Sequence, residues 1–303
     1  MIVLILTAVF YAGFLFYGDL NSIGELFLQI NLWYIPLILL VRFLAIILRS
    51  FRQKLFLQSL GIDIPIKFNT LVYISGLSMI VTPASSGTVI KSYILNKKFG
   101  TEYSKTIPIV ITEKYHDVLA PLSIISFMLI FVDIFEVQLI AVVLSIIMLA
   151  IYLITRKHNL LQKVINKTSK LKILNKFQEN LLDYYDSFHT LTNKKPFILG
   201  WMIGIFSIFV DGLAIYFGFL AFGVDFGFMN SLVTVYAANI LGMISFIPAG
   251  FGVVEVSLLG FLLKSGFVLS IASSMVLITR LSSAWFHIIL GFSVTSHLLK
   301  KIP

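Results

Sequence analysis

Long apolar runs and short polar segments alternate along most of the 303 residues. A transmembrane helix needs about 20 apolar residues, and longer runs can cross with a tilt. Six runs meet this requirement, near residues 2–17, 32–48, 106–132, 137–155, 197–222 and 269–298. The pattern therefore predicts an all-α polytopic membrane protein with about six full transmembrane helices.

Two further apolar regions, 70–96 and 229–264, are interrupted in their middles. Each divides into pieces of roughly 13–19 residues, which are short for full spans. The interruptions contain Pro83, Gly87, Pro248, Gly250 and Gly252. Backbone without hydrogen bonds cannot face lipid, so such breaks must be shielded by protein or line a wet cavity. We expect two re-entrant-type hairpins, and full crossings remain the alternative.

The two broken regions resemble each other. Pro83 and Pro248 are 165 residues apart, and Gly87 and Gly252 have the same separation. Upstream, Gly61 and Asp63 match Gly223 and Asp225 after a three-residue gap. Chance similarity between two Gly- and Ser-rich segments is the alternative to a repeat. We predict one integral membrane domain, 1–303, with repeat one at about 32–133 and repeat two at about 197–298.

The basic residues predict an orientation. If the N-terminus is cytoplasmic and each hairpin returns to its own side, 18 of the 23 Lys and Arg lie on inner segments and only Lys264 lies outside. This asymmetry follows the positive-inside rule, so we expect a multi-pass plasma-membrane protein with both termini cytoplasmic. The first hairpin then opens inward and the second outward, as in the inverted-topology repeats of many secondary transporters. The segment 156–195 is expected to be an amphipathic connector on the anionic inner leaflet.

Composition excludes several classes of protein. The chain is 58% hydrophobic and contains no cysteine, which rules out disulfides and cysteine-ligated metal sites. The formal charge of +9 is explained by the Lys and Arg residues on the predicted inner segments, so no nucleic-acid partner is expected. No GxxxxGK[ST], HExxH or GxSxG motif occurs, and we predict neither ATP-driven pumping, nor a cofactor, nor a metal site.

Eight charged residues remain within the predicted spans: Arg42, Lys91, Lys114, Arg280, Glu113, Asp117, Asp211 and Glu255. Each costs on the order of 2.5–3.5 kcal/mol to insert, so partners or water are expected. In one interpretation they pair and hold helices together. In the other, Lys91, Lys114 and Arg280 line a polar cavity for an anionic headgroup, while Glu113, Asp117 and Glu255 position these cations or carry a coupling proton. His116 is a candidate for proton coupling, with packing as the alternative.

Three segments, "TPASSGTVIKSYIL", "ITEKYHDVLA" and "FIPAGFGVVEVSLLGFLL", resemble the membrane flippase domain of bacterial phosphatidylglycerol lysyltransferases and its stand-alone bacterial and archaeal relatives. The family motifs are Pro-x-x-x-Gly-Glu, Glu-Arg-x-x-Asp and Pro-x-Gly-x-Gly-x-x-Glu. By position, the resemblance implicates Pro83, Gly87, Lys91, Glu113, Lys114, Asp117, Pro248, Gly250, Gly252, Glu255 and Arg280. Thr88 stands where the family has Glu, and Lys114 stands where it has Arg, which removes the bidentate fork. The soluble aminoacyltransferase domain is absent, so we do not expect lysyl transfer.

The resemblance implies a flippase-like transporter rather than an enzyme. Its cargo would be an anionic or zwitterionic lipid headgroup, with aminoacyl-phospholipid or polyprenyl-phosphate-linked sugar as candidates. One alternative is a membrane-embedded enzyme acting on lipid phosphates, with Glu113, His116 and Asp117 as acid and base. Another is a secondary transporter of a small solute or ion. The sequence leaves a homodimer open.

Overall fold

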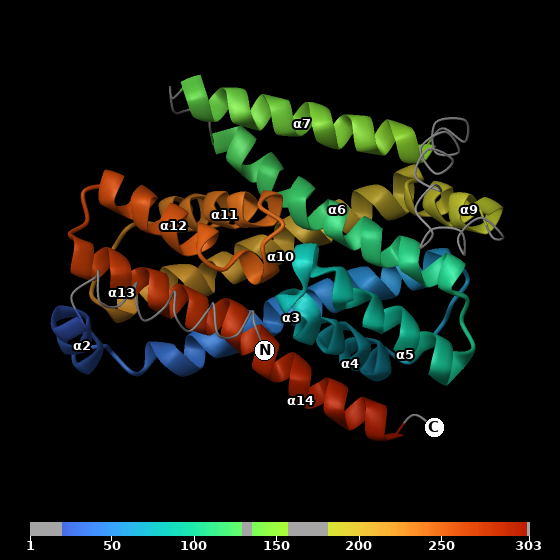
Figure 1. Cartoon of the computed structure of the whole chain (residues 1–303), viewed down its shortest axis with the longest axis horizontal. Coiled ribbons are helices and arrows are strands. Elements are labelled where there is room, and N and C mark those ends of the chain that lie inside the picture. The colour runs from blue at the N-terminus through green and yellow to red at the C-terminus, as the bar shows by residue number, and fades with distance from the viewer. Residues whose placement is uncertain (1–19, 129–134, 157–180, 302–303) are drawn as a thin grey trace. The chain divides into compact units, whose positions relative to one another are not determined.

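The computed structural model describes the backbone of residues 20–128, 135–156 and 181–301, which contains helices and connecting loops but no strand. The all-α class is confirmed. The α-helices are α2 (Leu20–Leu28), α3 (Tyr34–Ser59), α4 (Ile66–Leu77), α5 (Ile90–Phe99), α6 (Tyr103–Met128), α7 (Phe135–Arg156), α9 (Leu181–Leu191), α10 (Lys194–Ala221), α11 (Phe228–Ile244), α12 (Val253–Lys264), α13 (Leu269–Arg280) and α14 (Phe286–Lys301) (Figure 1). The predicted first span at 2–17 and residues 157–180 of the predicted connector lie outside the described residues.

Three stretches of helix in the described chain are long and apolar enough to cross a bilayer: Tyr34–Ser59, Lys194–Ala221 and Leu269–Lys300. Large apolar side chains such as Leu40, Ile146 and Ile289 are more than half exposed, which suits a lipid-facing surface. These features identify a helical membrane protein. The expected number of about six full spans stays a prediction.

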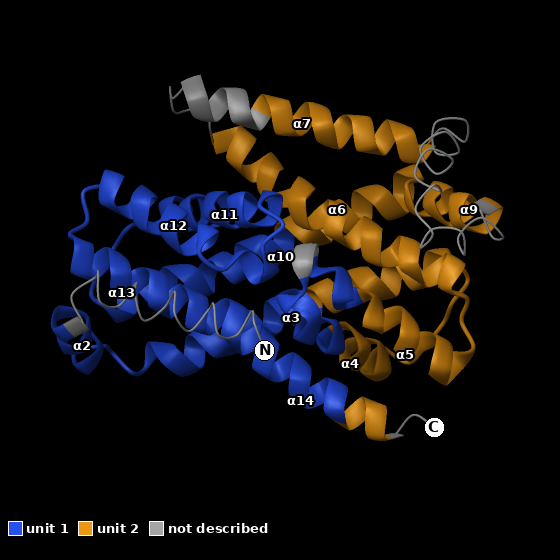
Figure 2. Ribbon diagram, in the orientation of Figure 1, with its two compact units in different colours: residues 1–47, 74–88, 206–296 blue, residues 48–73, 89–205, 297–303 orange. Residues whose placement is uncertain are grey.

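The helices form two compact units (Figure 2). Unit 1 comprises residues 1–47, 74–88 and 206–296, and unit 2 comprises residues 48–73, 89–205 and 297–303. Unit 1 contains both interrupted segments and helices α11, α12 and α13. Unit 2 contains α5, α6, α7 and α9, and α6 packs against the other three.

Two boundaries differ from the sequence prediction. The run expected to end near residue 48 continues as α3 to Ser59, because apolar residues Leu55, Phe56 and Leu57 extend its buried face past the charges. Residues placed on an inner segment, including Arg52, are therefore helical. The polar stretch before α3 was expected to be an outer loop, but it contains α2, which packs against α13.

The first interrupted region is broken where the sequence predicted. α4 gives way to two 3₁₀ segments, η1 (Ser78–Val81) and η2 (Pro83–Val89), before α5 begins. The hydroxyl oxygen of Thr82 accepts a hydrogen bond of 2.7 Å from the N–H of Gly87. A Cβ at Gly87 would lie 2.8 Å from the methyl carbon of Thr82, so the turn requires glycine there.

The second interrupted region is broken more sharply. A short 3₁₀ turn, η5 (Pro248–Gly250), separates α11 from α12. Phe246, Ala249, Gly250 and Gly252 all have φ between 51° and 88°, a conformation that L side chains adopt only at a cost. The backbone therefore reverses within a few residues. Glycine at two of these four positions reduces the strain.

The two breaks contact each other within unit 1, through η1 and η5. α14 also packs closely on η1, since a Cβ at Gly291 would lie 2.2 Å from the backbone nitrogen of Ser78. Thr295 on α14 donates a hydrogen bond of 3.1 Å to the carbonyl of Ser75 and lies 3.2 Å from the hydroxyl of Ser78. Protein therefore shields part of the first break. The expectation that the breaks line a wet cavity stays a prediction.

The turns after α3 and α10 are built alike. Gly61 and Gly223 have φ of 73° and 70°. The next residue in each turn bonds back to the carbonyl five positions earlier, Ile62 to Leu57 and Val224 to Phe219. This 6→1 bond around a left-handed glycine is the Schellman pattern of helix ends. Asp63 and Asp225 each accept a side-chain hydrogen bond from the residue nine positions earlier, Lys54 and Tyr216 respectively. These local matches support a repeat without establishing its inverted orientation.

Candidate functional site

The eight charged residues expected within the spans form four ion pairs. Two pairs lie in unit 1 and two in unit 2. The pairs are Arg42–Asp211, Arg280–Glu255, Lys91–Glu113 and Lys114–Asp117. The structure thus shows the pairing that the sequence analysis gave as the structural interpretation.

In unit 2, Lys91 and Glu113 form a buried pair between α5 and α6. Both side chains are about 95% buried, and the Lys91 ammonium also donates a hydrogen bond of 3.1 Å to the side-chain oxygen of Gln53. Gln53 in turn donates to Asn69, and Asn69 donates to the backbone carbonyl of Ser50. The second oxygen of Glu113, Oε1, is buried without a hydrogen-bond partner among the described residues. This network fixes Lys91, so we assign it a positioning role.

Asp117, one turn along α6, pairs with two cations. Arg52 donates from Nη2 to one carboxylate oxygen, and the Lys114 ammonium lies 3.7 Å from the other. The charge of Arg49 also acts on Asp117. Arg52 is 1% exposed, whereas the Lys114 side chain is 36% exposed. Of the cations that act on Asp117, Lys114 is therefore more accessible than Arg52.

Arg52 was not among the charged residues predicted to lie within the spans. It was placed on an inner polar segment because Arg49, Arg52 and Lys54 follow an apolar run closely. Apolar residues recur at helical spacing through Leu57, and this pattern could have predicted that the helix extends past Arg52.

We call Arg49, Arg52, Lys91, Lys114, Glu113 and Asp117 the cation cluster. Its four basic and two acidic groups leave a formal surplus of two positive charges. Glu113 and Asp117 lie about 15 and 21 Å along α6, which is about 39 Å long at 1.5 Å per residue. A surplus of positive charge so far from both helix ends favours an anionic ligand, because an uncompensated charge at this depth is costly.

His116 lies beside the cluster but serves the packing of unit 2. It is fully buried, with Nδ1 2.8 Å from the carbonyl of Thr112 and Nε2 3.1 Å from the carbonyl of Phe197. Gly200 and Gly204 form a GxxxG pair that lets α10 approach α6, as small residues do between membrane helices. Glu113, His116 and Asp117 therefore contact different partners and do not converge as an acid–base group.

In unit 1, Arg280 and Glu255 brace the second break. Arg280 Nε donates to Glu255 Oε1 at 2.7 Å, and Nη2 donates to the carbonyl of Ala249 at 2.9 Å. The other oxygen of Glu255 accepts from the N–H of Gly252 at 2.8 Å. The guanidinium also lies 5.3 Å from the ring centre of Phe251. Three of these contacts reach residues of the break, so Arg280 and Glu255 together hold the break in place.

A π-helical turn, Leu281–Trp285, follows Arg280 directly and separates α13 from α14. Such single π turns inside α-helices are frequent at functional sites. Arg280 is the last residue of α13 before the turn, and it reaches Glu255 on α12.

The remaining pair, Arg42 and Asp211, lies elsewhere in unit 1. Arg42 Nη1 is 2.7 Å from Asp211 Oδ2, and that oxygen also accepts a hydrogen bond of 2.8 Å from the hydroxyl of Tyr236. Arg42 and Asp211 are 2% and 5% exposed. The pair links α3, α10 and α11, and its inaccessibility indicates a packing role.

Outside the spans, a hydrogen bond from Lys54 lowers the pKa of the exposed Asp63 below its usual value. Asp63 therefore stays ionised near neutral pH. No group of three or more His, Cys, Asp or Glu in the part of the chain that the structure describes could hold a metal ion.

The fold and the buried charges define a polytopic helical membrane protein with two broken helical regions. Its sequence matches the family described as the lysylphosphatidylglycerol synthase TM region over residues 1–291, and the chain belongs to this family. A UPF0104 membrane protein of Pyrococcus horikoshii is 24% identical over 306 residues, covering 91% of this chain and 90% of the relative. A UPF0104 membrane protein of Methanocaldococcus jannaschii is 25% identical over 223 residues, covering 73% of this chain and 93% of the relative. The resemblance to stand-alone archaeal relatives is thereby confirmed.

Proposed function

We propose that this protein moves an anionic or zwitterionic lipid headgroup between the two leaflets of a membrane. The observation that carries the proposal is the positive surplus of the cation cluster, in which Lys114 is more accessible than Arg52. A phosphate-bearing headgroup would neutralise that surplus, and the lipid tails would stay in the bilayer. Membership of a family named after the membrane region of a lipid synthase supports a lipid as cargo.

The broken helices of unit 1 supply the second part of the proposal. Irregular backbone at membrane depth is tolerated where it is buried in protein or lines a cavity, and discontinuous helices are frequent in transporters. The contact between η1 and η5 brings two such segments together. We propose that a rearrangement of this contact opens the protein to one leaflet and then to the other. An inverted repeat would make the two open states related by symmetry.

Lys114 would bind the headgroup, and Asp117, Arg49 and Arg52 would set the potential around it. Lysine presents a compact charge without the bidentate fork of arginine, which suits cargo whose phosphate geometry varies. Aminoacyl-phospholipid and polyprenyl-phosphate-linked sugar both carry an anionic phosphate, and both remain candidates. Downhill flow, an ion gradient or a partner would supply the energy.

Fluorescent lipids in proteoliposomes test the proposal against its alternatives. The protein should accelerate the loss of leaflet asymmetry for a phosphatidylglycerol analogue, and the recovered lipid should be chemically unchanged. Conversion of the lipid to a new species would favour the membrane enzyme. Transport of water-soluble anions without lipid exchange would favour the solute transporter. Either result would overturn the lipid proposal.

A further inference from the structure

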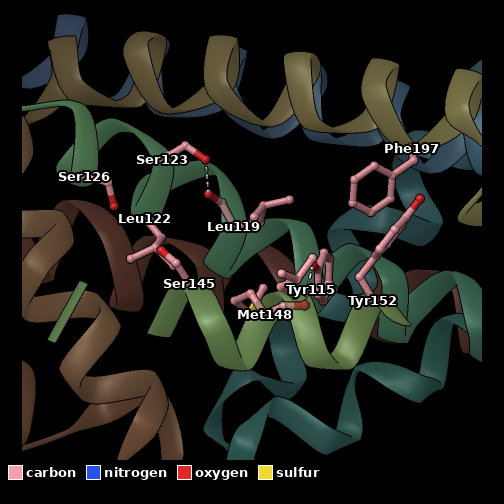
Figure 3. A pocket seen from close by; sticks show the side chains of 10 residues that line it. Tyr115, Leu119, Leu122, Ser123, Ser126, Ser145, Met148, Tyr152 and Phe197 are labelled. Carbon is pink, nitrogen blue, oxygen red and sulfur yellow. Dashed lines mark hydrogen bonds between the residues drawn. The ribbon is translucent and has the colours of Figure 1, made fainter. Parts of the chain in front are cut away.

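Unit 2 contains a cavity of about 520 Å³ between α6, α7 and the first turns of α10 (Figure 3). This volume lies within the range of roughly 300–1,000 Å³ that is typical of small-molecule sites. Its lining is mainly carbon and includes Leu119, Leu122, Met148 and Phe197. Leu149 also lines it and is 56% exposed, so the cavity opens along α7.

Two hydroxyl groups on the wall, those of Tyr115 and Ser123, bond to the protein itself. The Tyr115 hydroxyl donates to the carbonyl of Met148 at 2.9 Å. The Ser123 hydroxyl donates to the carbonyl of Leu119 at 2.7 Å and accepts from the indole N–H of Trp201 at 3.2 Å. These groups have little need of a polar ligand, so the cavity favours hydrocarbon.

One end of the cavity leads to basic residues. Tyr152 and Phe197 line this end, and their rings lie 4.9 Å apart. Arg156 is one helical turn beyond Tyr152 on α7, and Lys194 is one turn before Phe197 on α10. Residues spaced by three or four share a helix face, so both cations flank the cavity end. Arg156 is held by a 2.8 Å hydrogen bond to Asn193, while Lys194 and the adjacent Lys195 are exposed.

This cavity is separate from the cation cluster. On α6 the cavity is lined by the stripe of Tyr115, Leu119 and Ser126, whereas the cluster uses Glu113 and Asp117. At 3.6 residues per turn, the two stripes face nearly opposite sides of the helix. A lipid in the cavity therefore cannot place its headgroup on Asp117 or Glu113 from that side.

We propose that the cavity holds one acyl chain of a resident anionic phospholipid whose headgroup lies at Arg156 and Lys194. Apolar walls receive the chain, and the two cations receive the phosphate, as basic sites between membrane helices do. The positive-inside rule predicts that this end faces the cytoplasm, so the lipid would come from the inner leaflet. The proposal is independent of the transport function, because the cavity lies on the face of α6 opposite Glu113 and Asp117.

Native mass spectrometry of the whole protein, released from micelles containing phosphatidylglycerol and phosphatidylcholine, tests the proposal. Wild type should retain one phosphatidylglycerol in preference to phosphatidylcholine. Lys194→Gln and Arg156→Gln should each weaken retention about fivefold, since a basic residue near an anionic membrane surface contributes about 1 kcal/mol. Lys264→Gln, on exposed α12 surface, should not change it. Displacement of the lipid by free glycerol phosphate would show a soluble-anion site and overturn the proposal.

A second variant tests the acyl chain. Ser126→Phe places a ring in the cavity and should reduce retention, whereas Ser293→Phe on the exposed face of α14 should leave it intact. A lipid with a photoactivatable acyl chain should crosslink to α6 or α7 in wild type, which gives a readout even if Ser126→Phe folds poorly. Crosslinking elsewhere only, or unchanged retention by a folded Ser126→Phe protein, would overturn the proposal. Lys114→Ala should retain the lipid, which separates this site from the proposed transport function.

Discussion

The guanidinium of Arg280 and the carboxylate of Glu255 lie 2.7 Å apart, and both side chains are at least 95% buried. Glu255 also caps the first turn of α12 by accepting the Gly252 N–H, and Arg280 reaches the carbonyl of Ala249. The pair therefore fastens the two sides of the second break to α13. From sequence, Arg280 was a candidate headgroup ligand, and its contacts instead favour a brace.

We therefore predict that Arg280→Ala acts first on stability. Removal of one partner leaves a buried carboxylate uncompensated, which costs roughly 3–5 kcal/mol. Thermal unfolding in detergent should show a large loss for Arg280→Ala and a smaller loss for the double variant Glu255→Gln/Arg280→Met, which removes both charges. If Arg280→Ala unfolds like wild type, the brace is wrong and a ligand role for Arg280 regains support.

Gly291 tests the packing of α14 on the first break. A Cβ there would lie 2.2 Å from the Ser78 nitrogen and 2.8 Å from the Leu77 carbonyl carbon, which are backbone atoms that cannot swing away. We expect Gly291→Ala to destabilise by roughly 1–3 kcal/mol through overpacking. Gly260→Ala is the matched control, because nothing lies within 4 Å of a Cβ at Gly260 in α12. Helix propensity should make that control neutral or stabilising by up to about 1 kcal/mol. Equal effects of the two substitutions on the melting temperature would contradict this packing.

Substitution of His116 distinguishes a packing role for this residue from a role in proton coupling. Both ring nitrogens face main-chain carbonyls. The centre of the His116 ring lies 5.5 Å from that of Phe56 and 4.9 Å from that of Phe197. We predict that His116→Gln lowers the free energy of unfolding by about 1–3 kcal/mol, because a buried group loses its partner. The pH profile of lipid transport should keep its shape. Loss of the pH dependence in a stably folded His116→Gln protein would restore the coupling role.

The sequence predicted the helical class and both breaks for definite physical reasons, and it gave pairing of the buried charges as one of two interpretations. Long apolar runs leave few alternatives to helices in a bilayer, and Pro83 and Pro248 interrupt such runs visibly. The cost of an isolated charge predicts partners in general terms. This cost does not identify the partner of each charge. Glu113, Lys114 and Asp117 lie on one helix, and their partners depend on which residues of other helices pack against it.

Arg52 and α2 show where the sequence was insufficient. Arg52 lies close to the polar end of α3, where charge alone indicates a loop, and only its contact with Asp117 reveals a buried role. Residues 20–28 are too few to predict a helix from periodicity, and packing of α2 against α13 is a tertiary effect. The lipid cavity between α6 and α7 likewise depends on how separate helices meet.

Translocation of a fluorescent phosphatidylglycerol by Lys114→Ala proteoliposomes shows whether Lys114 binds the headgroup. The Lys114 side chain is 36% exposed and 3.7 Å from Asp117, so its truncation should cost no more than about 1 kcal/mol of stability. We predict that Lys114→Ala folds normally and loses most translocation, that Lys114→Arg restores much of it, and that Lys264→Ala behaves like wild type. Wild-type translocation by a folded Lys114→Ala protein would show that the cation cluster does not bind the cargo through Lys114.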